Sequence, residues 1–232
     1  MLSPRPLLGR RQIVAGFAGL GALALLAGCK ADRQGNAVGD TLRDLRDRPV
    51  KVAQRPAKLS IDDGRYLIAL ALIHPDPVSV LAGWSGDIKR IGPETYGAFL
   101  KRYPALEKLP TIAPSNLPFQ VEPVLAAKPD VALVSLGTGP SDTQIAQLEG
   151  AGIGVAFIDF FSHPFKNQAA SLTLLGALTG REEQAAAYNS FRQERLDRIA
   201  AKVNGIPQDK RPAVFLEPHA GLTPDCCNSP GN

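Results

Sequence analysis

Apolar and polar positions in the middle of the chain follow a repeated rhythm of short and long runs. The short runs are rich in β-forming residues and predict strands, at residues 57–61, 78–84, 111–113, 131–135 and 154–160. The longer runs between them have helical spacing, at residues 64–73, 96–103, 121–127 and 142–150. Strands that alternate with helices at this distance predict βαβ units and a mainly parallel sheet, which is an α/β fold.

Signals at the ends of these runs support the helices. The helix over 121–127 should end at Lys128, because Pro129 follows it. The next helix starts with Ser141 or Asp142 as its N-cap and should end near Gly150 or Gly152.

Residues 165–204 break the rhythm because the whole stretch has helical spacing, with Gly176 and Gly180 marking a boundary between two helices. The second helix, residues 181–203, would be about 35 Å long. One of its faces is apolar: Ala185, Tyr188, Phe191, Leu196, Ile199 and Val203. A further strand is then expected at 213–217.

The N-terminal residues have the pattern of an export signal. A basic stretch with Arg5, Arg10 and Arg11 precedes 16 uncharged residues, 13–28, which is short for a membrane-spanning helix. The sequence "LAGC" ends this run and resembles the lipobox of bacterial lipoproteins. The resemblance implies that Cys29 is lipidated after removal of residues 1–28 and anchors the protein to a membrane. Arg10 and Arg11 leave a twin-arginine export route open.

Charge adds little once the signal is removed. The net charge of +4 falls to about +1, because the three arginines leave and no acid leaves with them. No basic run with interleaved aromatic residues is present, so nucleic acid is not expected as a partner. Residues 29–48 are polar and predict a flexible tether.

Metal and redox sites are weakly supported. The three histidines (His74, His163 and His219) show no metal-ligand spacing. Cys226 and Cys227 are adjacent, which suits neither a tetrahedral metal site nor an unstrained disulfide. Their role stays open between a strained vicinal disulfide, a metal site and a plain loop. No resident cofactor is expected.

Three segments together resemble one family, the Fe/B12 periplasmic-binding domain: "DDGRYLIALALIHPDPVSVLAGW", "VEPVLAAKPDVALVS" and "AGIGVAFIDF". The resemblance covers about residues 50–220. It implies two α/β lobes bridged by a long helix, with a complete N-terminal lobe and an incomplete C-terminal lobe. The bounds would be 49–180 for the first lobe, 181–204 for the interlobe helix and 205–232 for the start of the second lobe.

The resemblance also implies a function. Proteins of this family are the substrate-binding components of ABC importers for ferric siderophores, haem and cobalamin. We therefore expect a monomer that is exported, lipid-anchored and facing the periplasm or the cell exterior. It would deliver an iron chelate, most simply a ferric siderophore, to a permease whose ATPase is a separate subunit. The alternatives are a surface haem or metal-chelate scavenger, a sensor not coupled to a permease, or a truncated protein without function.

Residue roles follow from the same resemblance. Glu122, at the start of its helix, matches the family's glutamate that docks on the permease, although an acid there also complements the helix dipole. Ligand contacts are expected in loops at the carboxyl ends of the strands. The candidates are Arg65, Trp84, Ser135, Phe160, Phe161, Glu217 and His219.

These candidates have simpler alternatives. Arg65 could be a solvated residue at a helix start, and Trp84 a core anchor below its loop. Phe160 and Phe161 are adjacent, so one of them should face the core. An enzyme is not expected, because "GTGP" at 137–140 lacks the third glycine of a dinucleotide fingerprint and no Gly-x-Ser-x-Gly motif occurs.

Overall fold

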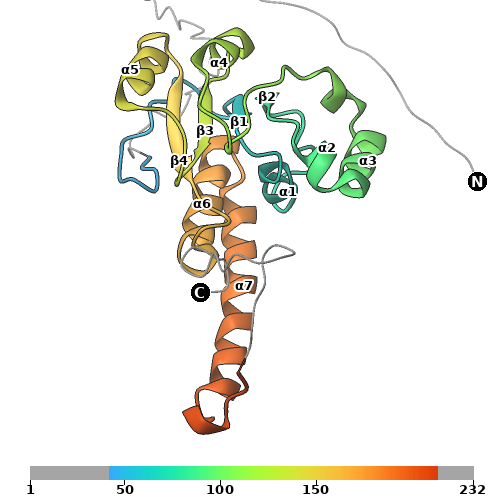
Figure 1. Cartoon of the computed structure of the whole chain (residues 1–232), viewed down its shortest axis with the longest axis vertical. Helices are drawn as coiled ribbons and strands as arrows, with labels where there is room; N and C mark the ends of the chain where they lie inside the picture. Colours follow the sequence, from blue (N-terminus) through green and yellow to red (C-terminus); the bar gives the residue numbers. More distant parts are fainter. Residues whose placement is uncertain (1–41, 214–232) are drawn as a thin grey trace, which may run out of the picture. The chain divides into compact units, whose positions relative to one another are not determined.

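A four-stranded parallel sheet forms the centre of the structure, a computed structural model that describes residues 42–213. Its strand order is β2-β1-β3-β4, and each neighbouring pair is parallel. The strands are β1 Leu59–Ile61, β2 Leu81–Trp84, β3 Val131–Ser135 and β4 Gly154–Ile158 (Figure 1). The α/β class and the parallel sheet expected from the sequence are confirmed.

Helices follow the strands in the expected order. They are α1 Tyr66–Ala71, α2 Ile88–Ile91, α3 Pro93–Arg102, α4 Val121–Ala127, α5 Asp142–Gly150, α6 Pro164–Thr179 and α7 Glu182–Val203. Two short 3₁₀ helices, Pro104–Lys108 and Gln208–Lys210, complete the described elements.

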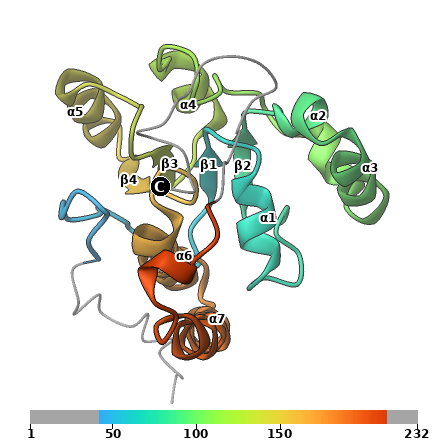
Figure 2. The same cartoon turned by 60° about the horizontal axis from the view of Figure 1, so that its bottom comes forward.

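Strand β3 is buried on both faces and separates two hydrophobic clusters. Val131 and Leu133 belong to the cluster shared with α1 and α6. Ala132 and Val134, which point the other way, belong to the cluster shared with α4 and α5. Figure 2 shows these helix pairs on opposite sides of the sheet. A parallel strand covered on both faces explains why β3 reads as an uninterrupted apolar run.

The helix ends read from the sequence are confirmed. Lys128 adopts the left-handed conformation after α4, directly before Pro129. Ser141 is the N-cap of α5, and its hydroxyl accepts from the N–H of Gln144 while the Gln144 side chain accepts from the N–H of Ser141. Helix α5 ends at Gly150.

Two expected strands differ from the structure. Residues 111–113 do not form a strand, because only Thr111 makes an isolated bridge to Trp84. Strand β4 ends at Ile158 and not at residue 160, because the Asp159 carboxylate accepts hydrogen bonds from the N–H groups that follow and turns the chain.

The expected tether overlaps the folded part of the chain. Residues 42–50 lie along β4, where the N–H of Leu45 donates to the carbonyl of Phe157 at 3.1 Å. The buried carboxylate of Asp44 in turn accepts from the N–H of Phe157 at 3.3 Å, and the Arg46 guanidinium lies 3.5 Å from the centre of the Phe157 ring. Residues 42–48, which belong to the expected tether, therefore lie against the outer edge of β4, with Leu42 packed on the hydrophobic core.

The junction between α6 and α7 lies at Gly180 alone. Gly180 has a φ of 66°, which caps α6. Gly176 lies inside α6, where a Cβ atom would stand only 2.7 Å from the Cβ of Ala185. Gly176 is thus a close-packing position between the two helices and not a boundary.

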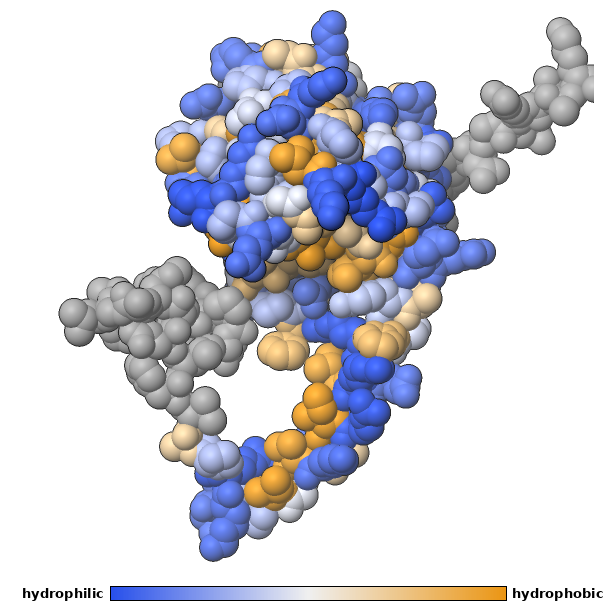
Figure 3. All heavy atoms as spheres, turned by 90° about the vertical axis from the view of Figure 1, so that its right-hand side faces the viewer, coloured by the Kyte–Doolittle hydropathy of each residue, from blue (hydrophilic) through white to orange (hydrophobic). Residues whose placement is uncertain are grey.

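Helix α7 continues well beyond the sheet. Its 22 residues span about 33 Å, which agrees with the long helix expected from the sequence. Ala185 is buried against α6, while Phe191, Ile199 and Val203 are exposed. Figure 3 shows this apolar stripe along the helix. Among residues 42–213, no helix combines the length and apolar character needed to cross a bilayer.

Candidate functional site at the carboxyl edge of the sheet

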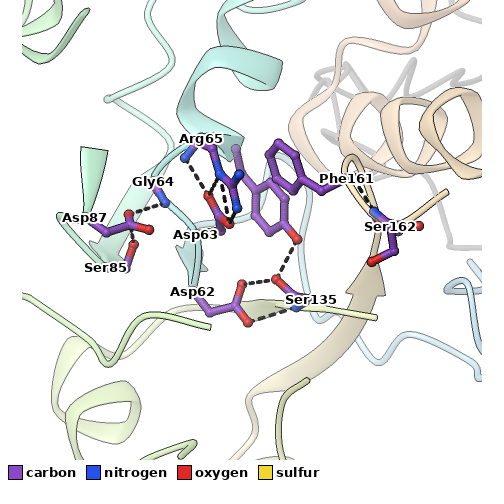
Figure 4. A network of polar contacts seen from close by, with 11 residues as sticks. Asp62, Asp63, Gly64, Arg65, Ser85, Asp87, Ser135, Phe161 and Ser162 are labelled. Carbon is purple, nitrogen blue, oxygen red and sulfur yellow. Dashed lines mark hydrogen bonds and ion pairs between the residues drawn. The ribbon is translucent and has the colours of Figure 1, made fainter. Parts of the chain in front are cut away.

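The four parallel strands end at the same edge of the sheet, where ligands bind in open α/β folds. This carboxyl edge brings together four aspartates, one arginine, one tyrosine, one phenylalanine and one serine from different parts of the chain (Figure 4). They are Asp62, Asp63, Asp87, Asp159, Arg65, Tyr66, Phe161 and Ser135.

Asp62 directly follows β1 and is 2% exposed. One carboxylate oxygen accepts from the N–H of Ser135 at 2.8 Å and the other accepts from the Ser135 hydroxyl at 3.1 Å. Loss of hydration on burial outweighs these hydrogen bonds and raises the pKa of Asp62 to about 7. Asp62 therefore exchanges its proton near neutral pH.

Ser135 connects Asp62 to Tyr66 at the start of α1. The Ser135 hydroxyl lies 2.7 Å from the Tyr66 hydroxyl, and either oxygen can donate. Burial, with the nearby Asp62 carboxylate as a second cause, raises the pKa of Tyr66 above its usual range. A continuous chain of hydrogen bonds thus runs from Asp62 through Ser135 to Tyr66.

Arg65 is held by its neighbour Asp63. The Asp63 carboxylate, which is almost fully buried, accepts from Arg65 Nε at 2.9 Å and from Nη2 at 2.5 Å. This hydrogen-bonded pairing raises the pKa of Arg65 above its usual range, against the opposing effect of partial burial. The Arg65 side chain remains 38% exposed, so its outer face is open to a ligand.

Phe161 contacts both Arg65 and Tyr66. Its ring centre is 3.6 Å from the guanidinium carbon of Arg65. Its ring centre is also 5.9 Å from that of the Tyr66 ring, at an interplanar angle of 15°. These three residues form a group of stacked contacts, called the Arg65–Phe161–Tyr66 stack below. It joins α1 to the loop between β4 and α6.

Asp159 organises that loop. Its carboxylate accepts from the N–H groups of Phe161, Ser162 and His163 at 2.8–3.0 Å and from Asn167 Nδ2 at 2.8 Å. Burial acts to raise the pKa of Asp159, but the four donors outweigh it and hold that pKa below its usual value. Asp159 therefore stays ionised and fixes the backbone that carries Phe161.

Asp87 fixes the start of the β1–α1 loop from the β2 side. It accepts from the N–H of Gly64 at 2.7 Å and from the Ser85 hydroxyl at 2.6 Å. A Cβ atom on Gly64 would stand 2.5 Å from the same Asp87 oxygen. A side chain at this position would have to displace the Asp87 carboxylate that accepts from the Gly64 N–H, so glycine suits the position.

A separate pocket of about 400 Å³ lies between α1 and α3, away from this edge. It is lined by Ala71, His74, Pro75, Ala98, Phe99, Arg102 and Tyr103. It contains none of the residues at the carboxyl edge. Across residues 42–213, no group of three or more His, Cys, Asp or Glu side chains is arranged to hold a metal ion.

Comparison with known proteins places the chain in a family. The family described as "Periplasmic binding protein" matches residues 70–223, which is more than half of the chain. The chain belongs to this family. Its members are solute-binding proteins, so the expectation of a binding protein and not an enzyme is confirmed.

Solved structures of periplasmic binding proteins share the fold. The TroA-like protein FepB from Veillonella parvula matches with a TM-score of 0.61 and 24% identity, over 72% of this chain and 50% of that one. The molybdate-binding protein MolA from Haemophilus influenzae matches with a TM-score of 0.58 and 16% identity, over 73% and 55%. The chain thus spans about half the length of these proteins. Comparison with curated proteins gives no match.

The structure of this periplasmic binding protein brings three of the expected ligand residues together: Arg65, Ser135 and Phe161. Two others need correction. Trp84 is 1% exposed and stacks on Tyr96, so it is the core anchor that was considered as the alternative. Phe160 is buried in the hydrophobic cluster with α1 and α6, while Phe161 is the half-buried member of the pair.

Of the other residues considered from the sequence, Glu122 stands apart from this cluster, His163 borders it through the hydrogen bond to Asp159, and five lie outside the described residues. Glu122 is exposed in the first turn of α4, where the sequence placed it. His163 occupies the N-cap position of α6. Cys29, Glu217, His219, Cys226 and Cys227 lie outside the described residues.

Sequence reasoning missed the buried polar residues of the binding protein. The sequence pattern assigned no role to Asp62 and placed Tyr66 only within the helical run 64–73. The available signal was position: an acid placed directly after a buried strand, with a tyrosine four residues later, lies at the carboxyl edge and not on the outer surface.

Proposed function

We propose that this protein is the substrate-binding component of an ABC importer that captures a ferric siderophore or a related iron chelate and delivers it to a permease. The observation that carries the proposal is the Arg65–Phe161–Tyr66 stack at the carboxyl edge, with the outer face of its guanidinium exposed. Membership in the periplasmic binding protein family supports the coarser part, a solute-binding role.

The chemistry of the stack favours a chelate over a small oxyanion. Asp63 already neutralises Arg65 through hydrogen bonds from its Nε and Nη2, and the Asp87 carboxylate also acts on it. A naked oxyanion such as the molybdate bound by MolA would gain little net attraction there. A bulky chelate with flat aromatic groups can instead stack on the exposed guanidinium plane and accept a hydrogen bond from its free edge.

Delivery and anchoring complete the proposal. Glu122 is exposed at the N-terminus of α4, where its carboxylate is free to meet a basic surface of a permease. Cys29 would carry the lipid that holds the protein at the membrane. The second wall of the binding cleft would come from a second lobe that includes Glu217 and His219.

Binding is tested with the full chain and a panel of named ligands. Ferric enterobactin, ferrichrome, haemin and cyanocobalamin would be titrated against the fluorescence of Trp84, the single tryptophan, with molybdate as the oxyanion comparison. Coloured chelates quench a buried tryptophan by energy transfer, so Trp84 need not touch the ligand. We expect saturable quenching by at least one iron chelate. Molybdate is colourless and cannot quench by energy transfer, so its binding would be followed by calorimetry, where we expect none.

Variants assign the site. Arg65→Gln and Phe161→Ala should each weaken the bound chelate about tenfold or more, a loss on the order of 1.4 kcal/mol. Arg90→Gln, an exposed arginine on α2, is the matched control and should bind normally. Equal affinity in Arg65→Gln and Arg90→Gln would place the ligand elsewhere. Glu122→Lys should retain binding and lose uptake in cells.

A further inference from the structure

Asp62 differs from the other buried acids at the carboxyl edge in what surrounds its carboxylate. Asp63 has the Arg65 guanidinium, and Asp159 has four hydrogen-bond donors. Asp62 has donors from Ser135 only, one from its backbone and one from its hydroxyl. Its charge is therefore the least compensated of the three, although it lies directly beneath the stack that faces the proposed ligand.

The hydrogen-bond chain from Asp62 can run in two directions. When Asp62 is ionised, the Tyr66 hydroxyl can donate to Ser135 and the Ser135 hydroxyl donates to Asp62. When Asp62 is neutral, its own O–H can donate to the Ser135 oxygen, and the Ser135 hydroxyl can turn to donate to Tyr66. Both arrangements use the same oxygen positions, so a proton on Asp62 changes the orientation of two hydroxyl groups without moving the backbone.

Charged groups from each neighbouring element act on the hydrogen-bonded residues Asp62, Ser135 and Tyr66. Asp63 and Arg65 come from the β1–α1 loop, and Asp87 comes from the loop after β2. Asp159, from the loop after β4, acts on Tyr66, and within residues 42–213 the charged groups that act on Asp62 and Tyr66 are all carboxylates. An anionic chelate arriving here meets mostly negative neighbours. Removing the Asp62 charge lowers that repulsion.

We propose that Asp62 is a positioning residue for ligand capture: in its neutral form it orients the Ser135 and Tyr66 hydroxyls below the Arg65–Phe161–Tyr66 stack and removes a negative charge beneath an anionic chelate. This proposal rests on the proposed function for its ligand. By reciprocity, an anionic chelate binds more tightly as the pH falls through the titration of Asp62, and its binding takes up protons. A neutral chelate lacks this dependence.

The first test needs no ligand. The Nε–H signal of Arg65, which Asp63 holds in place, would be followed by NMR between pH 5 and pH 8 in the full chain. We expect it to shift with a midpoint near neutral pH in the wild type and to stay constant in Asp62→Asn, whose side-chain amide imitates the neutral acid. Asp142→Asn, an exposed aspartate on α5, is the matched control and should titrate like the wild type. A signal that does not titrate, or titrates equally in Asp62→Asn, overturns the proposal.

The second test uses ferric enterobactin, which is anionic, and ferrichrome, which is neutral. If ferric enterobactin binds, its affinity should be roughly three- to tenfold higher at pH 6 than at pH 8 in the wild type. Asp62→Asn should keep the high affinity at both values. Calorimetry in buffers of different ionisation enthalpy should show proton uptake in the wild type only. A pH-independent wild-type affinity for ferric enterobactin would contradict the proposal.

The two tests separate this inference from the function on which it rests. If no chelate binds at any pH while the Arg65 Nε–H signal titrates in the wild type and not in Asp62→Asn, the proposed function is wrong. The coupling between Asp62 and Arg65 is then still supported. If chelates bind but the Arg65 signal does not respond to Asp62, the function stands and the positioning role fails. Ser135→Ala, which cuts the chain but keeps Asp62, should weaken the pH dependence of the Tyr66 ring signals.

Discussion

Two aspartates at the carboxyl edge, Asp62 after β1 and Asp159 after β4, are both buried and have opposite acidities. Burial raises the pKa of Asp62 to about 7, whereas the pKa of Asp159 lies below its usual value. Their exposed fractions hardly differ, at 2% and 3%, but Asp62 lies deeper among other atoms and loses more hydration. Asp62 also has fewer hydrogen-bond donors, two against four for Asp159.

The comparison shows how one sheet edge provides both a fixed charge and an adjustable one. Asp159 accepts from three successive backbone N–H groups, which hold it ionised and shape the loop that carries Phe161. Asp62 follows a strand whose next residues turn away into α1, so only Ser135 reaches it. Asp159 therefore stabilises the loop that carries Phe161, whereas Asp62 is the carboxyl that can take up or release a proton at the proposed binding edge.

The largest effect is expected from removing the fixed charge. Asp159→Ala leaves three loop N–H groups and Asn167 without their acceptor, which should lower the free energy of unfolding by about 3 kcal/mol. Urea unfolding at neutral pH measures this. Asp130→Ala is a control that removes one backbone acceptor contact, to Lys58, and should cost much less. Equal losses in the two variants would contradict the scaffolding role.

The adjustable charge should be visible as a pH dependence of stability. Because folding raises the pKa of Asp62, the folded state holds its proton where the unfolded chain has lost it. The stabilisation is complete below the unfolded pKa near 4 and is lost as the pH rises to about 7. Between pH 5 and pH 7.5, the stability of the wild type relative to Asp62→Asn should fall by about 2 kcal/mol. A constant difference would argue against a raised pKa.

The same measurement sharpens the contrast with Asp159. Folding lowers the pKa of Asp159, so the stability that it contributes is present above the usual carboxyl pKa and is lost as the pH falls below it. Asp159→Asn should therefore reduce the loss of stability on acidification, while Asp62→Asn acts in the opposite pH direction.

A smaller effect is expected at the link between the two hydroxyls. Ser135→Ala removes the hydroxyl that joins Asp62 to Tyr66, and should cost on the order of 1 kcal/mol because the backbone N–H of residue 135 still donates to Asp62. Thermal unfolding of this variant beside Tyr66→Phe, which removes the other end of the contact, measures it. A double variant whose loss equals the sum of the two would show that the hydroxyls are not coupled.

The smallest effect on stability is expected at Arg65. Its side chain is partly exposed, so the pairing with Asp63 is screened and Arg65→Gln should change the free energy of unfolding by less than about 1 kcal/mol. The same variant should weaken chelate binding about tenfold or more. A large loss of stability with normal binding would show that Arg65 serves the fold and not the ligand.

The sequence predicted the fold well because local signals and burial agreed. The strand at 131–135 is apolar throughout and lies in the sheet as expected, and Ser141 caps α5 with a capping box. The strand expected at 111–113 failed because edge pairing depends on a neighbour: Thr111 meets only Trp84, and nothing in three apolar residues shows how far a partner extends.

The site was predictable in position and less so in detail. Arg65, Ser135 and Phe161 could be placed at one edge because parallel strands end together. Trp84 could not be distinguished from a surface aromatic, since its burial depends on Tyr96 and the helices beyond β2. The raised pKa of Asp62 could not be predicted either, because it depends on burial and on which donors reach the carboxylate. The residue that donates, Ser135, is 73 positions away in the sequence.

The most direct test of the account is a titration of both aspartates in one sample, by NMR of ¹³C-labelled carboxyl carbons, with Asp62→Asn and Asp159→Asn assigning the two signals. The account predicts one carboxyl, Asp62, with a midpoint near 7 and another, Asp159, with a midpoint below the usual value for aspartate. If both carboxyls titrate together in the usual acidic range, the hydrogen-bond donors at this edge do not set the two charges apart, and the role assigned to Asp62 is wrong.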